Sequence, residues 1–251
     1  MNRPWASHAL APELDTALAA VREAGLLCRS VQSLIDPGTL EKKDKSPVTV
    51  ADFGSQALVC RALGEVFPND PVIGEEDSAD LKEEGNQDTL ERMLSHVQKL
   101  RPEANAETVC GWIDRGGAKD YSDRFWTLDP IDGTKGFLRK MQYAISLALI
   151  IDGRIEVAAL GCPNLGIELT GDRGEGTVYL AIRGAGVWQV PLTGEGAAEP
   201  IKASPEADST RIRFCESVES AHSSHSDSAR IARHLAIVAE PARLDSQTKY
   251  A

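Results

Sequence analysis

The stretch Phe125-Trp126-Thr127-Leu128-Asp129-Pro130-Ile131-Asp132-Gly133-Thr134 places an apolar strand directly before a tight acidic turn. Its first four residues are typical of a strand, while Pro130 fixes one backbone torsion and Gly133 permits conformations that other residues resist. The turn can therefore aim two carboxylates and a peptide carbonyl in one direction, and Mg²⁺ takes oxygen ligands of this kind. Asp-Pro and Asp-Gly are also ordinary turn dipeptides, so this stretch alone leaves a plain turn open.

A second acidic corner lies upstream at Pro71-Val72-Ile73-Gly74-Glu75-Glu76-Asp77, where a short apolar strand again leads into a glycine and then acids. Three adjacent acids on a solvated loop would be unremarkable, but open sheets place their ligands at strand ends. Packing two acidic strand ends together without a metal would cost several like-charge repulsions. The pair of corners therefore favours a metal site.

A third acid, Asp52, follows the polar turn at Lys45-Ser46-Pro47-Val48. The sequence predicts a helix cap at Thr49 and a helix from near residue 51 to Phe67, which puts Asp52 in the first helical turn. An acid in a first turn ordinarily answers the helix dipole, and for Asp52 on its own this is the preferred interpretation.

These three segments, in this order, resemble the lithium-sensitive, Mg²⁺-dependent phosphatases related to inositol monophosphatase. The corner continues as Thr134-Lys135-Gly136-Phe137-Leu138-Arg139, which is similar to the 3′(2′),5′-bisphosphate nucleotidases of that superfamily. Residues 215–225 and 245–250 are similar to nucleotide-binding segments of the same group. The resemblance runs from about residue 45 to the last residue. It implies an α/β layered fold of the α+β type, a sandwich of helices and mostly antiparallel sheets.

The resemblance implies a metal site with Mg²⁺ as the cofactor. Its ligands would be the side chains of Glu75, Asp129 and Asp132 together with the main-chain carbonyl of Ile131. Glu76 would be a supporting acid beside these ligands.

The resemblance also implies the residues that handle water and substrate. Asp52 and Thr134 would orient and deprotonate the attacking water, and Thr134 would also contact the substrate. The nucleotide and its second phosphate would be held by His222, Ser246 and Lys249. The implied reaction is hydrolysis of the 3′(2′)-phosphate of adenosine 3′(2′),5′-bisphosphate to AMP and phosphate. Further candidate substrates are 3′-phosphoadenylyl sulfate and inositol 1,4-bisphosphate.

One part of the family's pattern is absent from this sequence. The resemblance implies a further metal-binding aspartate in a late Trp-Asp motif and an arginine before it. Only Tyr250 and Ala251 follow Lys249, and Trp188 is followed directly by Gln189 and not by an acid. We therefore expect a C-terminally truncated form of the fold that is nearly inactive alone. The alternative is a catalytically impaired paralogue or fragment that only binds bisphosphate nucleotides.

Composition limits the partners and the compartment. The net charge of −11 argues against non-specific binding to nucleic acid, and the longest apolar run, residues 144–151, is too short to cross a bilayer. Early acids such as Glu13 and Glu23 do not fit a secretion signal, and five scattered cysteines favour a reduced compartment. We expect a small-molecule substrate, no nucleic-acid or membrane partner, a monomer when the protein is complete, and a cytoplasmic protein, with an organelle left open.

The pattern of apolar residues predicts helices packed against a largely antiparallel sheet. Helices are predicted at residues 12–35, 51–67, 89–100 and 226–236. Strands are predicted at residues 125–129, 144–151, 154–160, 178–182, 187–190 and 212–215. The turn Asp152-Gly153 predicts a hairpin, and residues 78–124 are expected to be a solvated insertion, with a flap over the site as the minor alternative. Two regions are expected: 1–160, which binds metal, and 161–251, an incomplete nucleotide-binding region.

Overall fold

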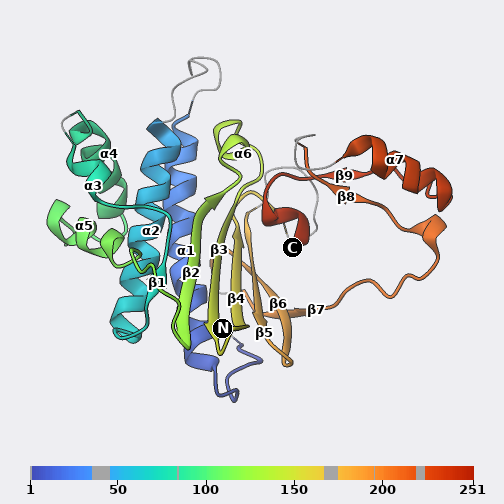
Figure 1. The fold of residues 1–251 in the computed structure, drawn as a ribbon, viewed down its shortest axis with the longest axis horizontal. Helices are drawn as coiled ribbons and strands as arrows, with labels where there is room; N and C mark the ends of the chain where they lie inside the picture. The colour runs from blue at the N-terminus through green and yellow to red at the C-terminus, as the bar shows by residue number, and fades with distance from the viewer. Residues whose placement is uncertain (1, 36–45, 84, 167–174, 195, 219–223) are drawn as a thin grey trace.

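A computed structural model describes residues 2–35, 46–83, 85–166, 175–194, 196–218 and 224–251. Two long helices, α1 (Ala11–Ser33) and α2 (Ser46–Val66), pack side by side against one face of a seven-stranded sheet (Figure 1). Three shorter helices cover the outer side of α2: α3 (Ala79–Lys82), α4 (Gln87–Gln98) and α5 (Ala106–Asp114). This layered arrangement confirms the predicted fold class.

The sheet follows the chain from strand to strand in the order β1 to β7. Its strands are β1 (Val72–Ile73), β2 (Arg124–Asp132), β3 (Ala144–Ile151), β4 (Arg154–Cys162), β5 (Thr177–Ile182), β6 (Gly186–Pro191) and β7 (Glu199–Ile201). β1 pairs with β2 in parallel, and each later pair is antiparallel. The β3–β4 hairpin turns at Asp152 and Gly153, whose φ angles of 50° and 73° suit the predicted two-residue turn.

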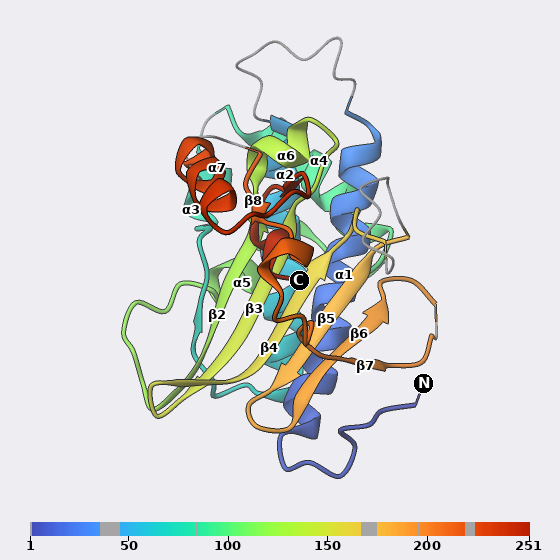
Figure 2. The same cartoon turned by 90° about the vertical axis from the view of Figure 1, so that its right-hand side faces the viewer.

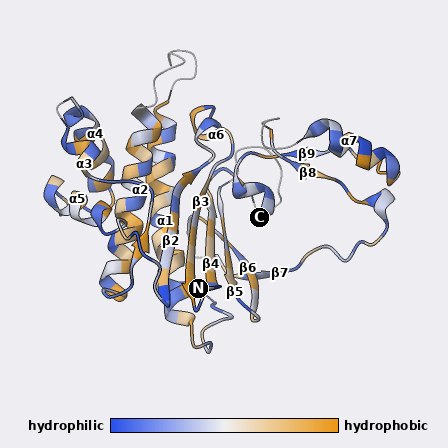
Figure 3. Ribbon diagram, viewed as in Figure 1, coloured by the Kyte–Doolittle hydropathy of each residue, from blue (hydrophilic) through white to orange (hydrophobic). Residues whose placement is uncertain are grey.

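A row of buried cross-strand partners shows how the inner face of the sheet is built. The row is Leu128, Leu147, Ala159, Leu180 and Trp188. These residues belong to the same hydrophobic cluster as the buried side chains of α1 and α2. Figure 3 shows the hydrophobic colour concentrated on these two helices and on the strands they cover. The alternation that buries one strand face therefore also fixes the register, since a one-residue slip would turn this row outward.

After β7 the chain leaves the sheet. The described elements that follow are η1 (Ser209–Arg211), β8 (Cys215–Glu216), α7 (His225–His234), β9 (Ala242–Arg243) and η2 (Gln247–Tyr250). β8 and β9 form a separate parallel pair, and η2 returns to β3, where the Thr248 hydroxyl donates to the Tyr143 carbonyl at 3.4 Å (Figures 1 and 2). The predicted late helix is confirmed, whereas the strand predicted at 212–215 is only Cys215–Glu216.

The predicted start of the second helix was wrong. α2 begins at Ser46, so Thr49 lies inside it and Asp52 lies in its second turn. Proline is a common turn residue, but Pro47 also fits the first helical turn, where its missing N–H has no partner to lose. Val48 is buried in the core, and this burial favours the earlier start.

The solvated insertion predicted for residues 78–124 was also wrong, because α3, α4 and α5 lie there and pack on the rest of the fold. Their buried residues include Leu81, Met93, Val97, Val109 and Ile113. A local signal was present: Asn105 and Thr108 form a capping box that starts α5.

The division expected at residue 160 falls inside β4, and the sheet continues across it to β7. The strands within residues 161–201 therefore share one sheet with β2 and β3. The assignment of residues 161–251 to nucleotide binding stays a prediction. Among the described residues, no helix is both long enough and apolar enough to cross a lipid bilayer.

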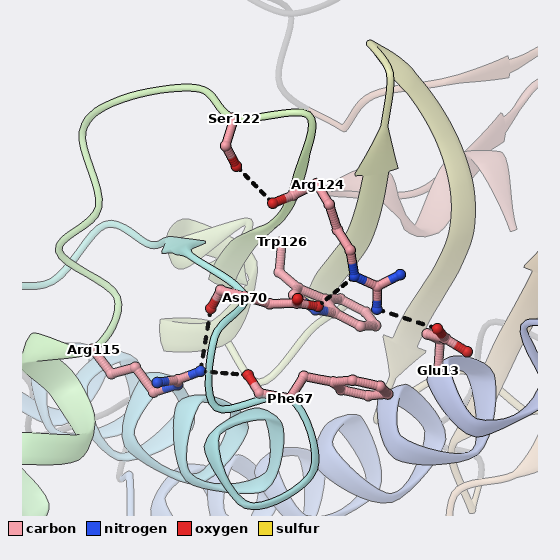
Figure 4. Close-up of polar contacts among 7 residues, drawn as sticks. All are labelled: Glu13, Phe67, Asp70, Arg115, Ser122, Arg124 and Trp126. Carbon is pink, nitrogen blue, oxygen red and sulfur yellow. Dashed lines mark hydrogen bonds and ion pairs between the residues drawn. The ribbon is translucent and has the colours of Figure 1, made fainter.

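A polar cluster joins the helices to the sheet at the amino end of β2 (Figure 4). One carboxylate oxygen of Asp70 accepts hydrogen bonds from Arg124 Nε at 2.8 Å and from Trp126 Nε1 at 3.0 Å. Arg124 also reaches Glu13 of α1 at 3.2 Å, and Arg115 Nη2 donates to the Asp70 carbonyl at 3.1 Å. The buried indole of Trp126 therefore depends on Asp70 for its acceptor.

We expect Asp70→Ala to lower the free energy of unfolding by about 1–3 kcal/mol, because it leaves a buried N–H without an acceptor. Asp120→Ala, at an exposed loop position, should change the free energy by less than about 0.5 kcal/mol. Urea unfolding measures both. An Asp70 variant as stable as the Asp120 variant would contradict this role.

Candidate active site

The two predicted acidic corners lie at the same edge of the sheet. β1 and β2 are parallel, so the loop that follows Ile73 and the end of β2 at Asp132 point to one side. The pairing of β2 with β3 shifts between Asp129 and Asp132, where Pro130 interrupts the ladder. This bulge re-aims the end of the strand, as bulges near functional sites commonly do.

Gly133 turns the chain from β2 into α6 (Thr134–Leu138) with a φ of 90°. This left-handed conformation favours glycine, and a Cβ here would also lie 2.7 Å from the Ser246 Cβ. The predicted glycine turn is therefore confirmed. The absence of a side chain at Gly133 also lets Ser246 of the C-terminal segment pack closely against the turn. A pocket of about 370 Å³ lies between them, lined by Asp129, Ile131, Asp132, Gly133, Thr134, Lys135, Gly136, Asp245, Ser246, Gln247 and Lys249.

Asp52 lies on α2 and is 9% exposed. Burial, followed by the charges of Glu76, Asp129 and Glu75, raises the pKa of Asp52 to about 9. These causes show that α2 brings Asp52 within electrostatic reach of both acidic corners. Asp52 therefore does not serve as a first-turn acid that balances the helix dipole, because it lies in the second turn and the dipole effect falls off within the first.

The acids of the two corners raise one another's pKa values. Burial, then the charges of Glu75 and Asp132, raises the pKa of Asp129 to about 7. Burial, then Glu75, raises the pKa of Glu76 to about 7, and burial with the Asp132 charge raises the pKa of Glu75. A cluster of like charges that are partly withdrawn from water is stabilised by a cation.

The donor chemistry of these residues fits a hard cation. All the candidate ligands are oxygens, as Mg²⁺ prefers, and the Oδ1 atom of Asp129 is buried without a hydrogen-bond partner. In the described part of the chain, however, no three acidic, histidine or cysteine side chains converge into a complete metal-binding set. One oxygen of Asp132 accepts a hydrogen bond from the Gln247 N–H instead. The structure thus gathers the acids without closing a ligand shell around them.

The substrate residues predicted at the C-terminus divide into two groups. Ser246 and Lys249 line the pocket beside the acidic corner, together with the exposed Thr134. Ser246 holds a φ of 64°, a strained conformation of the kind that marks ligand sites. His222 lies outside the described residues. His225, interpreted as structural, donates from Nε2 to the Ser217 carbonyl at 2.8 Å, because a carbonyl only accepts.

The predicted pairing of Asp52 with Thr134 stays a prediction. In the ranges that the structure covers, no hydrogen bond joins the Thr134 hydroxyl to the Asp52 carboxylate. Thr134 begins α6 and lines the pocket, while Asp52 is not among the pocket's lining residues.

Two residues of α2 that the sequence did not single out each contact one of the acidic corners. Ser55 is fully buried, and its hydroxyl donates to the Pro130 carbonyl at 3.0 Å. Gln56, also fully buried, binds the backbone of Glu75 and Glu76. Their helical spacing from Asp52, three and four residues, was the available signal, since such positions share one helix face.

Solved structures with this fold include two bacterial proteins. CysQ from Bacteroides thetaiotaomicron, described as a bacterial member of the inositol monophosphatase family, matches with a TM-score of 0.52 at 18% identity, over 96% of this chain and 75% of that one. SuhB from Mycobacterium tuberculosis matches with a TM-score of 0.55 at 19% identity, over 96% of this chain and 71% of that one. At these identities the likeness defines the fold class.

The sequence pattern of the inositol monophosphatase family matches residues 9–251, and the chain belongs to this family. Its curated relatives include proteins named 3′(2′),5′-bisphosphate nucleotidase. The protein from Schizosaccharomyces pombe is 42% identical over 95% of this chain and 72% of its own length. The protein from Emericella nidulans is 39% identical over 92% of this chain and 73% of its own length.

The raised pKa of Asp52 makes stability depend on pH. Between the ordinary aspartate value of 3.8 and about 9, the folded chain keeps a proton that the unfolded chain releases. The free energy of unfolding of the metal-free chain should therefore fall as the pH rises through this window. Urea unfolding in a chelating buffer at about pH 5 and about pH 8 measures it.

Asp52→Asn should make the free energy of unfolding depend less steeply on pH, because asparagine does not titrate. Stability that rises between the two pH values, or an equally steep slope in the variant, would contradict the assignment.

Proposed function

We propose that the chain is a Mg²⁺-dependent phosphatase that hydrolyses the 3′(2′)-phosphate of adenosine 3′(2′),5′-bisphosphate, giving AMP and phosphate. The observation that carries this proposal is the pocket in which the acidic corner of β2 meets residues 245–249. A phosphate-hydrolysing centre and a nucleotide-binding segment need to adjoin in this way. The named activity of the curated relatives supports the same substrate class.

Each acid has a distinct task in this proposal. Glu75, Asp129, Asp132 and the Ile131 carbonyl would hold Mg²⁺. When bound, the cation supplies positive charge opposite the phosphate and leaving-group oxygens. With the cation bound, its positive charge would offset the neighbouring carboxylates and leave Asp52 ionised, so that Asp52 could accept a proton from water through the Thr134 hydroxyl.

Two lysines supply positive charge for an anionic substrate in a chain of net charge −11. Lys135 and Lys249 both line the pocket. Lys249 Nζ donates to the Ser246 carbonyl at 2.9 Å and lies 4.9 Å from the centre of the Tyr250 ring. Its ammonium group is thereby held beside the strained Ser246, where it can contact the second phosphate.

A second candidate function is binding of bisphosphate nucleotides without turnover. It is favoured by the Gln247 N–H that occupies one oxygen of Asp132 and by the incomplete ligand set among the described residues. Three points stay predictions: the action on 3′-phosphoadenylyl sulfate or inositol 1,4-bisphosphate, the monomeric state, and the cytoplasmic compartment.

Phosphate release from adenosine 3′,5′-bisphosphate tests the proposal directly. We expect slow release with Mg²⁺, because the acids of the described residues do not close a ligand shell, and none with a chelator. Asp129→Asn should abolish release and leave the fold intact, because it removes ligand charge and no core packing. Asp120→Asn, at an exposed loop position, is the matched control. Release that persists in Asp129→Asn at saturating Mg²⁺ would overturn the metal assignment, whereas nucleotide binding without release would favour the second function.

Lys249→Ala should mainly weaken discrimination for the second phosphate. We expect the variant to lose its preference for adenosine 3′,5′-bisphosphate over AMP in equilibrium binding, while the exposed Lys202→Ala control keeps it. A Lys249 variant that still prefers the bisphosphate would dismiss this role.

A further inference from the structure

Gln56 is a buried polar side chain whose amide oxygen and amide nitrogen each make two hydrogen bonds. It lies one turn after Asp52 on α2 and has no exposed surface. Its Oε1 accepts from the N–H groups of Glu75 and Glu76, both at 3.0 Å. Its Nε2 donates to the carbonyls of Glu76 at 2.7 Å and Ile113 at 3.0 Å. The partners fix the orientation of the amide, because N–H groups only donate and carbonyls only accept.

The backbone around Gln56 is shaped to receive this amide. A Cβ on Gly74 would lie 2.4 Å from Oε1, and a Cβ on Gly116 would lie 2.6 Å from Nε2. The backbones at these two glycines are also hydrogen-bonded to each other, with the Gly74 N–H donating to the Gly116 carbonyl at 2.8 Å. No residue with a side chain fits either position while Gln56 keeps its place.

A neutral amide is the group that this position requires. A carboxylate would add charge beside the already crowded Asp52, Glu75 and Glu76 and would offer no donor to the two carbonyls. An apolar side chain would leave the N–H groups of Glu75 and Glu76 and the Glu76 carbonyl without their partner at part-buried positions, while the Ile113 carbonyl would keep the Gly116 N–H. Each such buried group left without a partner costs about 1–3 kcal/mol. Gln56 therefore defines the turn in which Glu75 sits.

We propose that Gln56 is a positioning residue for the divalent-cation site, holding the Glu75 carboxylate in place through the backbone of Glu75 and Glu76. This inference rests on the proposed function, because it assigns Glu75 as a ligand. Groups that orient metal ligands in this way commonly change metal affinity 10–100-fold when they are removed. α2 would thus supply Asp52 and also fix the neighbouring acidic corner.

The test is Mn²⁺ binding to the full chain, since Mn²⁺ shares the oxygen preference of Mg²⁺ and is measured by electron paramagnetic resonance. Gln56→Met keeps the side-chain length and removes all four hydrogen bonds. We expect its dissociation constant for Mn²⁺ to rise about 10-fold or more. Asn105→Ala removes the α5 cap, which accepts from Thr108 N–H at 3.0 Å, and serves as the control for lost stability. It should leave the dissociation constant unchanged.

If Gln56→Met does not fold, Gly74→Ala carries the same test, because its methyl group displaces Oε1 while Gln56 remains. Hydrogen exchange in the metal-free chain adds a readout that needs no cation: the amides of residues 75 and 76 should lose protection in the variants, and those of β3 should keep it.

Wild-type affinity in folded Gln56→Met or Gly74→Ala would overturn the inference and leave the proposed function standing. An equal loss in Asn105→Ala would overturn it too, because the effect would then follow general stability. A wild-type chain that binds no Mn²⁺ would instead overturn the metal site of the proposed function, and the role of Gln56 with it.

Discussion

The structure depends on the crowding of carboxylates at one edge of the sheet, where Asp52 is buried and Glu76 and Asp129 are half-buried. Asp52, Glu75, Glu76 and Asp129 each have a raised pKa, and burial is the first cause in every case. Charges buried together are tolerated when rigid elements hold them and an opposite charge can bind. α2, packed between α1 and the outer helices, and β2, between β1 and β3, are such elements.

The pocket proposed to bind the substrate is built from two parts of the chain that are far apart in sequence. The sheet edge carries the acids, whereas the 245–249 segment reaches the same pocket only after the chain has left the sheet and returned to β3 (Figure 2). The contact between Gly133 and Ser246 and the hydrogen bond from Gln247 to Asp132 join the two parts. A change in Asp132 should therefore affect both cation binding and the placement of the nucleotide-binding segment.

The sequence allowed β2 to β6, the hairpin and the acidic corners to be predicted, because alternation, Asp152-Gly153 and the acids after apolar runs are local signals. β7 was not predicted, and the strand predicted at 212–215 is only Cys215–Glu216. The sequence did not allow the start of α2 or the packing of α3 to α5 to be predicted, since tertiary burial decides these. Ser55 and Gln56 were missed for a related reason. Their partners, the backbone of residues 75, 76 and 130, become neighbours only in the folded chain, and no local pattern in a helix names such a partner.

The central claim is that the acids at this edge form a divalent-cation site, and the most direct measurement is the free energy of unfolding with and without saturating Mg²⁺ near neutral pH. A ligand that binds only the folded chain adds about 2.7 kcal/mol at a concentration 100 times its dissociation constant. We predict an increase of this order with Mg²⁺ and none with K⁺ at matched ionic strength, which controls for screening. The same free energy in both salts would contradict the account.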